Sequence, residues 1–412
     1  MAEIIPFRGI LYNVSRVSME DVLAPPYDVI TSEYREALYM QSPYNIVRID
    51  FGKEEAGDNE AANKYTRAGG FLDSWLQEDV FIRSEKPSFY VYEMSYTIHD
   101  IKKRLLGFLG LVKLEELGKG SIFPHECTHS KPKQDRLNLM RSCEANTSPI
   151  FSLYKSTEGK ITNIFLEISM TKPYIEPTSI SGEVHRLWRI DDTEKIEIIR
   201  QELADKAVFI ADGHHRYETA FDFCKEMSAK ETSTNPRPFD HVLMFLANML
   251  DEGVTILPTH RLLKEVPKDM NKMLSKYFEI TPVQNDFDIR KGLSGKSRVF
   301  GFFEKGSKSW QILTYKGGNL SEIPPGLKEI DVIILHELVL KNILHTSEIG
   351  YEMDVERALD KVNSGEFNAA FFLNPTRVED VERSALSSVR MPPKSTYFYP
   401  KLLTGLVINK WG

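Results

Sequence analysis

The stretch "AVFIADGHHRYETAFDFCKEM", residues 207–227, decides how the middle of this chain folds. Its first part, "AVFIADG", is a short apolar run that ends in glycine, which is typical of a buried strand followed by a turn. After Gly213, apolar side chains recur at the three- and four-residue spacing of a helix that buries one face. The stretch therefore predicts a strand, a glycine turn and a helix that begins near His214.

The start of a helix after such a turn is suited to bind an anion, because its first N–H groups lack partners within the helix and carry the positive end of the dipole. Gly213 lets phosphate oxygens approach the backbone, and His214, His215 and Arg216 add hydrogen-bond donors. Asp212 would repel a bare anion, so we expect it either to cap the helix or to bind a Mg²⁺ that also contacts the phosphate. The simpler alternative is a capped helix with two surface histidines.

A second polar segment, "FPHECTHSKPKQDRLNLMR" at residues 123–141, contains an HExxH pattern made of His125, Glu126 and His129. On a helix this pattern supplies two zinc ligands and a general base. Pro132 and the lack of an apolar stripe argue against such a helix, so we expect a loop. A zinc hydrolase stays open as an alternative.

The charge of this segment favours anion binding instead. Basic side chains outnumber acidic ones there, although the whole chain has a formal net charge of −7. We therefore expect a basic loop that forms a substrate or nucleotide wall, with His125, Lys133 and Arg136 as members and Glu126 as a general base. The tail segment "PKSTYFYPK", residues 393–401, adds Lys394, Ser395 and Thr396 to this wall, unless it is simply a strand that packs its aromatic side chains into the core.

The composition sets limits on the class of protein. A chain of 412 residues with 42% hydrophobic and 27% charged residues is typical of a globular protein with two or three domains. The acidic balance argues against a general nucleic-acid binder, and no apolar run approaches the ~20 residues of a membrane helix. Three cysteines without a CxxC pair fit a reducing compartment, so we expect a cytoplasmic protein without membrane partners. A homo-oligomer stays open.

Strands and helices alternate with hairpins along the chain, which favours an α+β fold with mixed sheets and flanking helices. We expect three regions: an N-terminal α/β region at 1–95, a core with the phosphate motif at 96–265, and a C-terminal α+β region at 266–412. The usual nucleotide signatures, a GxxxxGK[ST] loop or a GxGxxG turn after a strand, are absent.

The stretch "ADGHHR" resembles the phosphate-binding signature of the ParB/sulfiredoxin superfamily, in which a short glycine motif ending in arginine opens a helix against a nucleotide's phosphates. The Asp-Gly-His-His-Arg version of the free-serine kinases matches residues 212–216. The whole chain is similar to a ParB-like domain-of-unknown-function family of about this length. The stretches that carry this similarity are "PPYDVI", "PHECT…KPKQDRL", "SPIFSLY", "ADGHHRYETA", "LPTHRLL" and "MPPKSTYFYPK".

The resemblance implies a ParB/sulfiredoxin-like nucleotide-binding core and a function. In the free-serine kinases an upstream glutamate is the base that acts on the serine hydroxyl, and Glu126 matches that role. Position 214 is histidine where sulfiredoxin has its reactive cysteine, and no basic helix-turn-helix follows the motif as in ParB. We therefore expect a kinase for a small hydroxylated metabolite such as serine, with ATP or ADP as the donor, Mg²⁺ at Asp212 and catalysis by Asp212 and Glu126. A non-catalytic nucleotide-binding switch of the ParB-like type is the main alternative.

Overall fold

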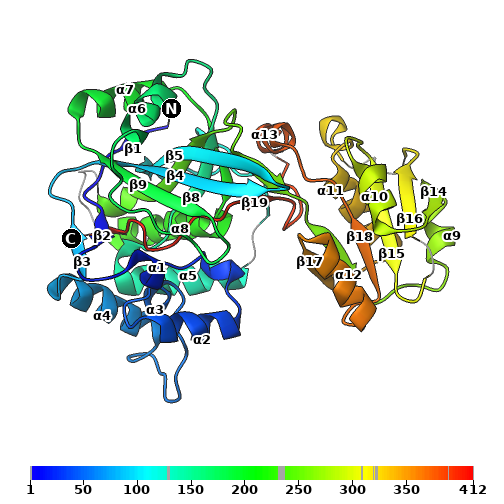
Figure 1. The fold of residues 1–412 in the computed structure, drawn as a ribbon, viewed down its shortest axis with the longest axis horizontal. Helices are drawn as coiled ribbons and strands as arrows, with labels where there is room; N and C mark the ends of the chain where they lie inside the picture. Colours follow the sequence, from blue (N-terminus) through cyan, green and yellow to red (C-terminus); the bar gives the residue numbers. More distant parts are fainter. Residues whose placement is uncertain are drawn as a thin grey trace. The chain divides into compact units, whose positions relative to one another are not determined.

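The protein is described by a computed structural model that covers residues 2–127, 130–230, 237–307, 310–318, 320, 323–387 and 389–411. Contacts divide the chain into two compact units (Figure 1). The first unit comprises residues 1–124, 128–255 and 400–412, and the second comprises residues 125–127 and 256–399. The chain therefore completes its first unit with a segment that follows the second unit.

The first unit contains an eight-stranded mixed sheet with the order β6-β10-β8-β11-β5-β4-β9, and β1 pairs with β5 outside this path. β10 runs parallel to β6 and antiparallel to β8, whereas β11 runs parallel to β8 and antiparallel to β5. The strands are β1 (Ile4–Ile5), β4 (Phe89–Ile98), β5 (Ile101–Lys113), β6 (Ile122–Phe123), β8 (Ile150–Tyr154), β9 (Val184–Ile190), β10 (Val208–Asp212) and β11 (His241–Asn248). The predicted α+β fold with mixed sheets and hairpins is confirmed, and β4 and β5 form the longest hairpin.

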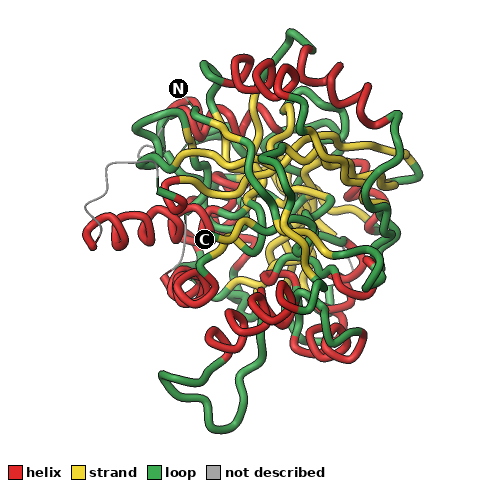
Figure 2. The backbone as a smooth tube through the Cα atoms, turned by 90° about the vertical axis from the view of Figure 1, so that its left-hand side faces the viewer, coloured by secondary structure: helices red, strands yellow, loops and turns green. Residues whose placement is uncertain are grey.

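Helices flank this sheet on both sides. In the view of Figure 1, α6 and α7 lie above the sheet, and α4, α5 and α8 lie below it. Figure 2 shows the strands inside and the helices outside in the part that faces the viewer. The helices are α1 (Met19–Val22), α2 (Ser32–Gln41), α3 (Val47–Asp50), α4 (Lys64–Gln77), α5 (Ser130–Cys143), α6 (Lys160–Ser169), α7 (Thr193–Leu203) and α8 (His214–Lys230), with short 3₁₀ turns at Tyr27–Val29 and Pro238–Asp240.

Two small ribbons complete the first unit. β2 (Ile10–Tyr12) pairs antiparallel with β3 (Phe81–Arg83), and β20 (Asn409–Lys410) pairs antiparallel with β7 (Ala145–Asn146). The second ribbon ties the end of the chain to the segment that follows α5. The last strand is thus part of the first unit.

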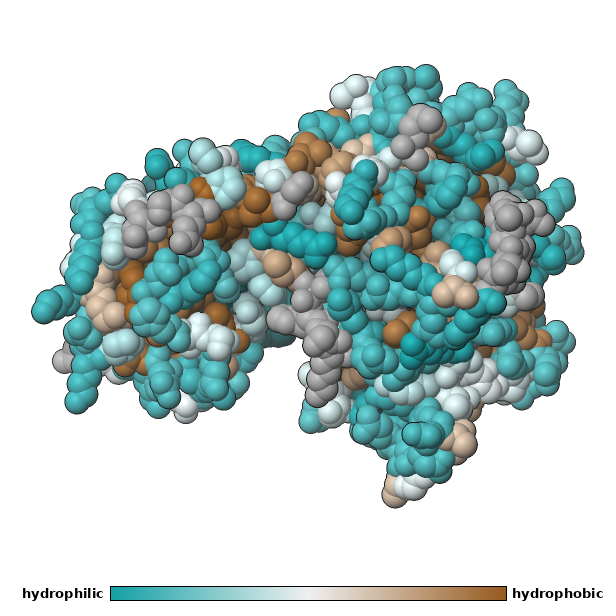
Figure 3. Space-filling model, turned by 180° about the vertical axis from the view of Figure 1, so that it is seen from behind, coloured by the Kyte–Doolittle hydropathy of each residue, from teal (hydrophilic) through white to brown (hydrophobic). Residues whose placement is uncertain are grey.

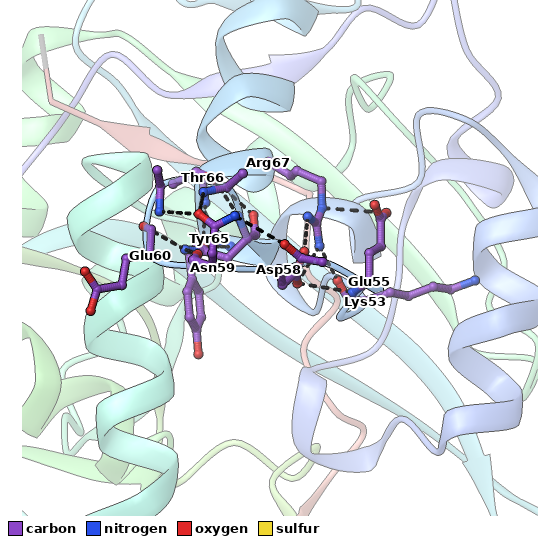
Figure 4. Close-up of polar contacts among 12 residues, drawn as sticks. Lys53, Glu55, Asp58, Asn59, Glu60, Tyr65, Thr66 and Arg67 are labelled. Carbon is purple, nitrogen blue, oxygen red and sulfur yellow. Dashed lines mark hydrogen bonds and ion pairs between the residues drawn. The ribbon is translucent and has the colours of Figure 1, made fainter.

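Local interactions fix the start of α4 and its packing. The Asn63 side chain accepts the N–H groups of Tyr65 and Thr66, which lack partners in the first turn of the helix. Arg67 binds Asp58 at 2.6 Å and holds the preceding loop against the helix, as the close-up in Figure 4 shows. Gly69 has no room for a side chain because a Cβ there would collide with the backbone of α5. The glycine therefore lets α4 and α5 approach closely.

The loop predicted for residues 123–141 is wrong, because residues 130–143 form the helix α5. Pro132 lies in the first turn of α5, where a missing N–H costs no intrahelical hydrogen bond. Leu139, Met140 and Cys143 are buried, so the helix has a short apolar face after all. Thr128 and His129 lie outside the described residues.

The second unit is built on an antiparallel sheet with the order β14-β16-β15-β18-β13-β17. These strands are β13 (His260–Leu263), β14 (Phe278–Val283), β15 (Val299–Glu304), β16 (Trp310–Tyr315), β17 (Ile349–Glu352) and β18 (Ala369–Phe372). Its helices are α9 (Met270–Leu274), α10 (Asp286–Leu293), α11 (Asp331–Ile333), the π-helix η4 (Ile334–Ile343), α12 (Val355–Ser364) and α13 (Val378–Leu386), with a 3₁₀ turn at Pro325–Leu327. The remaining strands are β12 (Thr255–Leu257) and β19 (Tyr397–Tyr399).

The expected regions do not follow these two units closely. Position 95 lies inside strand β4, in the middle of the large sheet. Position 265 lies shortly after the change from the first unit to the second at residue 255.

The surface on the face drawn in Figure 3 is mostly hydrophilic, with scattered hydrophobic side chains. In the described part of the chain, every helix is too short or too polar to cross a bilayer.

Candidate phosphate-binding site

The predicted strand–glycine–helix junction is confirmed. β10 ends at Asp212, Gly213 has a φ of +94°, and the 17-residue helix α8 begins at His214. A φ of this sign is a conformation that side chains disfavour, so glycine is required at the turn. The pairing of β10 with β8 shifts register between Ile210 and Asp212, which ends the regular ladder just before the turn.

The side chain of Arg216 lies over this turn. A Cβ on Gly213 would lie 2.9 Å from Nε of Arg216, so the absence of a side chain makes room for the guanidinium. Nη1 of Arg216 donates a hydrogen bond to the carbonyl of Pro149, the residue before β8. The guanidinium is thereby fixed at the N-terminus of α8 and keeps further N–H donors for a ligand.

Asp212 is engaged on both carboxylate oxygens. Oδ1 accepts the N–H of Gly213 at 2.8 Å, and Oδ2 forms an ion pair with Nζ of Lys401 at 2.9 Å. The Lys401 side chain is 14% exposed and the Asp212 side chain 24% exposed, so water screens this pair only in part. Lys401 thus brings a positive charge to the junction from a position 189 residues away in the sequence.

The partners of Asp212 limit how this residue could bind the predicted Mg²⁺. Mg²⁺ in nucleotide sites keeps several waters and takes one or two carboxylates together with phosphate oxygens. Asp212 offers one carboxylate at the N-terminal end of the helix, but Gly213 and Lys401 occupy its two oxygens, so a Mg²⁺ held mainly by the nucleotide would have to share Oδ2 with Lys401 or displace it. The described residues contain no group of three His, Cys, Asp or Glu side chains arranged around a metal.

The two histidines differ in environment. His214 is buried, whereas His215 is half-buried. Adjacent helix positions point about 100° apart, so the two rings face different directions. They therefore offer separate donors rather than one paired ligand set.

Arg136 is held by carboxylates and does not form an open basic wall. It is buried, with Nη2 2.6 Å from Asp135 and Nη1 3.4 Å from Asp50, and its guanidinium lies 4.0 Å from the ring centroid of Tyr27. Burial tends to lower the pKa of Arg136, but Asp50 and Asp135 outweigh it and raise the pKa. Lys133 on the same helix pairs with Glu218 of α8 at 3.0 Å.

Arg136 is nevertheless connected to the junction, because it lines the same small cavity as Arg216. Together with Arg216, Thr147 and Ser148 it lines a cavity of about 30 Å³, large enough for one water molecule. The hydroxyl of Thr147 donates to Oδ1 of Asp50 at 2.7 Å, so the ion-pair network extends to the wall of this cavity. Through Thr147, the ion pair of Arg136 and Asp50 is connected to the segment that carries Pro149, the hydrogen-bond acceptor of Arg216.

The other predicted residues meet in the second unit. Oε1 of Glu126 accepts hydrogen bonds from the N–H of Thr396 at 2.9 Å and from its hydroxyl at 3.0 Å. Nε2 of His125, whose side chain is fully buried, lies 2.9 Å from the same hydroxyl. The Ser395 hydroxyl donates to the carbonyl of Pro392. Segments about 270 residues apart in the sequence are therefore joined at Thr396.

Arg261, which was not among the predicted site residues, belongs to this group. It is 1% exposed, donates to the carbonyls of Thr259 and Lys394, and lies 5.0 Å from the ring centroid of Tyr351. Burial lowers its pKa to about 10. The stretch "LPTHRLL" carried the signal, a basic residue within an apolar strand, but a polar triplet after proline is more typical of a turn.

Comparison with solved structures finds weak similarities. A free serine kinase in complex with AMP is 14% identical, over 69% of this chain and 92% of that chain, with a TM-score of 0.36. SbnI with a C-terminal truncation, from Staphylococcus aureus, is 10% identical over 72% and 85%, with a TM-score of 0.36. A conserved hypothetical protein from Pyrococcus furiosus is 16% identical over 68% and 87%, with a TM-score of 0.34. Among curated proteins, none matches significantly.

The family comparison is stronger, because one family matches across most of the chain. The match spans residues 4–333, which include the whole strand–glycine–helix junction and the HE pair. The chain belongs to the DUF1015 family, a family of proteins of unknown function.

Proposed function

We propose that this protein is a nucleotide-binding phosphotransferase, a Mg²⁺-dependent kinase that uses ATP or ADP to phosphorylate a small hydroxylated metabolite such as serine. The observation that carries the proposal is the junction at Asp212–Arg216, where a glycine turn, a helix N-terminus and a fixed guanidinium converge. Such a junction binds phosphate through backbone N–H groups and the helix dipole. The match of these residues to the free-serine kinase motif also supports a phosphate-binding role for the junction.

In the proposed reaction the junction neutralises and orients the transferred phosphoryl group. The N–H groups of the first turn of α8 and the guanidinium of Arg216 bind phosphate oxygens, and His214 and His215 add donors. Mg²⁺, held by Asp212 and the phosphates, would offset the charge that builds up in the transition state. These are the contributions that phosphoryl transfer requires of a protein, because positioning and charge stabilisation supply most of the catalysis.

Glu126 is proposed as the base that accepts the proton of the acceptor hydroxyl. Both hydrogen bonds from Thr396 go to Oε1, and Oε2 has no hydrogen-bond partner among the described residues. Thr396 thus orients the carboxylate while Oε2 stays available for the proton. The deprotonated hydroxyl attacks the terminal phosphorus, and the bond from that phosphorus to the nucleotide breaks.

Two variants test nucleotide binding and phosphoryl transfer separately. Arg216→Ala is expected to weaken ADP and ATP binding by about tenfold or more, because a charge-assisted hydrogen bond to phosphate is lost. Isothermal titration calorimetry with Mg²⁺ measures this effect. Arg141→Ala is the matched control, because Arg141 pairs with Glu226 on the outer part of α8 at 2.6 Å. Unchanged nucleotide affinity in Arg216→Ala would refute the phosphate assignment.

Glu126→Gln is expected to retain nucleotide affinity and to lose phosphorylation of serine by about a hundredfold or more, as for the loss of a general base. Phosphoserine formation from [γ-³²P]ATP or [β-³²P]ADP measures this. Nucleotide binding without phosphorylation of serine or other small alcohols in the unmodified protein would favour the non-catalytic switch over the kinase.

A further inference from the structure

A groove of about 870 Å³ lies in the first unit, away from the phosphate junction. It lies between strand β3 with its following turn, the edge strand β9, and the segment after α6. The residues that line it are Leu11, Ile82, Arg83, Ser84, Glu85, Tyr90, Ile168, Thr171, Lys172, Pro173, Tyr174, Leu187, Trp188, Arg189 and Asp191. Its volume is in the range of pockets that hold small organic molecules.

The aromatic rings in this groove offer apolar surface only. Nε1 of Trp188 donates to the carbonyl of Thr171 at 3.0 Å, and the hydroxyl of Tyr174 donates to the carbonyl of Tyr12 at 2.8 Å. The hydroxyl of Tyr90 lies 2.8 Å from that of Ser84. Because their polar atoms are already bonded within the protein, the rings contribute hydrophobic contact area to a ligand.

The lining of the groove carries three cations, Arg83, Lys172 and Arg189, against two carboxylates, Glu85 and Asp191, so its net charge is positive. Arg83 is half-buried and donates to the carbonyl of Lys410 at 3.2 Å, and among the described residues it forms no ion pair. Burial, together with the nearby charge of Arg8, lowers its pKa. Lys172 is exposed and likewise has no carboxylate partner in the described part of the chain, whereas Arg189 lies 3.5 Å from Asp191. A positive groove on a chain of net charge −7 selects for anions.

We propose that this groove is a second ligand site, which binds a small organic anion with an apolar body. The anionic group binds Arg83 and Lys172, and the apolar body lies on Trp188 and Tyr174. Five strand spacings separate β9 from β10 in the sheet order, or roughly 24 Å, so the site is distinct from the phosphate junction. The proposal is independent of the kinase reaction.

The test uses 8-anilinonaphthalene-1-sulfonate, an aromatic sulfonate whose fluorescence rises when it leaves water. Saturable binding to the full-length protein is expected, with affinity unchanged by saturating ADP. Arg83→Met and Lys172→Glu are each expected to weaken binding by about tenfold, because an ion-paired hydrogen bond is lost or replaced by repulsion. Lys119→Glu is the matched control, since Lys119 is exposed and lies outside the groove.

Lys172 is exposed, so Lys172→Glu keeps the test decisive even if Arg83→Met fails to fold. Competition by benzoate, phenyl phosphate and octanoate then distinguishes carboxylates from phosphates and aryl from alkyl bodies. Binding that is displaced by ADP, or that both variants leave unchanged, would overturn the proposal. So would a dimer in light scattering that becomes monomeric in Lys172→Glu, because the groove would then be an interface between two copies of the chain.

Discussion

At the scale of single residues, Gly213 determines both the backbone conformation of the turn and the space available to Arg216. Its φ of +94° and the nearby guanidinium of Arg216 both exclude a side chain. The same residue therefore permits the turn that presents the helix N-terminus and makes the space that Arg216 occupies.

We expect Gly213→Ala to lower the free energy of unfolding by roughly 1–3 kcal/mol, the cost of backbone strain, and to weaken ADP binding because Arg216 must move. Urea denaturation and calorimetry measure the two effects. Gly70→Ala is the control: Gly70 lies in α4, where a Cβ would meet no atom within 4 Å. That substitution should stabilise the protein by about 0.5–1 kcal/mol, as expected in a helix. Equal stability changes in the two variants would contradict this account.

At the scale of elements, α5 connects α4 to α8 through charges. Asp135 of α5 binds Lys64 of α4 at 3.1 Å, and Lys133 binds Glu218 of α8. This explains why the sequence did not reveal α5: its partners are on other helices, and its own apolar stripe is short. The junction of β10 and α8 was predictable because an apolar run, a glycine and a helical pattern follow one another locally.

The ion pairs of α5 predict that the stability of the fold depends on pH. Burial would raise the pKa of Asp135, but Arg136 and Lys64 hold it below its ordinary value. A carboxyl whose pKa is lower in the folded state stabilises the fold above its unfolded pKa of about 3.9, and this stabilisation is lost as the pH falls through the folded value. Asp135→Asn should therefore be less stable than the original protein at pH 7.

The difference in stability between Asp135→Asn and the original protein should shrink as the pH falls below about 4. Thermal denaturation between pH 7 and pH 3 measures it. The control is Asp100→Asn in the exposed β4–β5 turn, where a φ of +62° suits asparagine equally well. A difference for Asp135→Asn that stays constant across this range would contradict the assignment.

At the scale of the whole molecule, the segment 400–411 completes the first unit after the chain has built the second. Ile408 exchanges backbone hydrogen bonds with Ile10 at 2.8 and 2.9 Å, and Trp411 stacks on Phe223 of α8 with ring centroids 5.0 Å apart. No local pattern could reveal these contacts, or the pairing of Lys401 with Asp212. The sequence therefore predicted the motif but not its partners.

Truncation after Tyr399, which removes residues 400–412, should unfold the first unit. Leu406, Val407 and Ile408 are each at most 2% exposed, and full burial of such side chains contributes about 1.5–3 kcal/mol each, which together is comparable to the whole stability of a domain. Circular dichroism and differential scanning calorimetry measure the loss. Lys401→Met is the companion variant. It is expected to stay folded and to bind ADP more weakly, because the junction loses a positive charge. A truncated chain that melts at the original temperature would contradict this role.

The pairing of Asp212 with Lys401 also bears on folding during synthesis. A ribosome that adds 5–20 residues per second needs roughly 10 to 40 s to make the 189 residues between the two side chains. Throughout that interval Lys401 has not yet been made, so its ion pair with the carboxylate of Asp212 cannot form. The nascent junction therefore carries the guanidinium of Arg216 and the positive end of the α8 dipole but lacks the charge of Lys401, and its attraction for phosphate is complete only after Lys401 has joined the first unit.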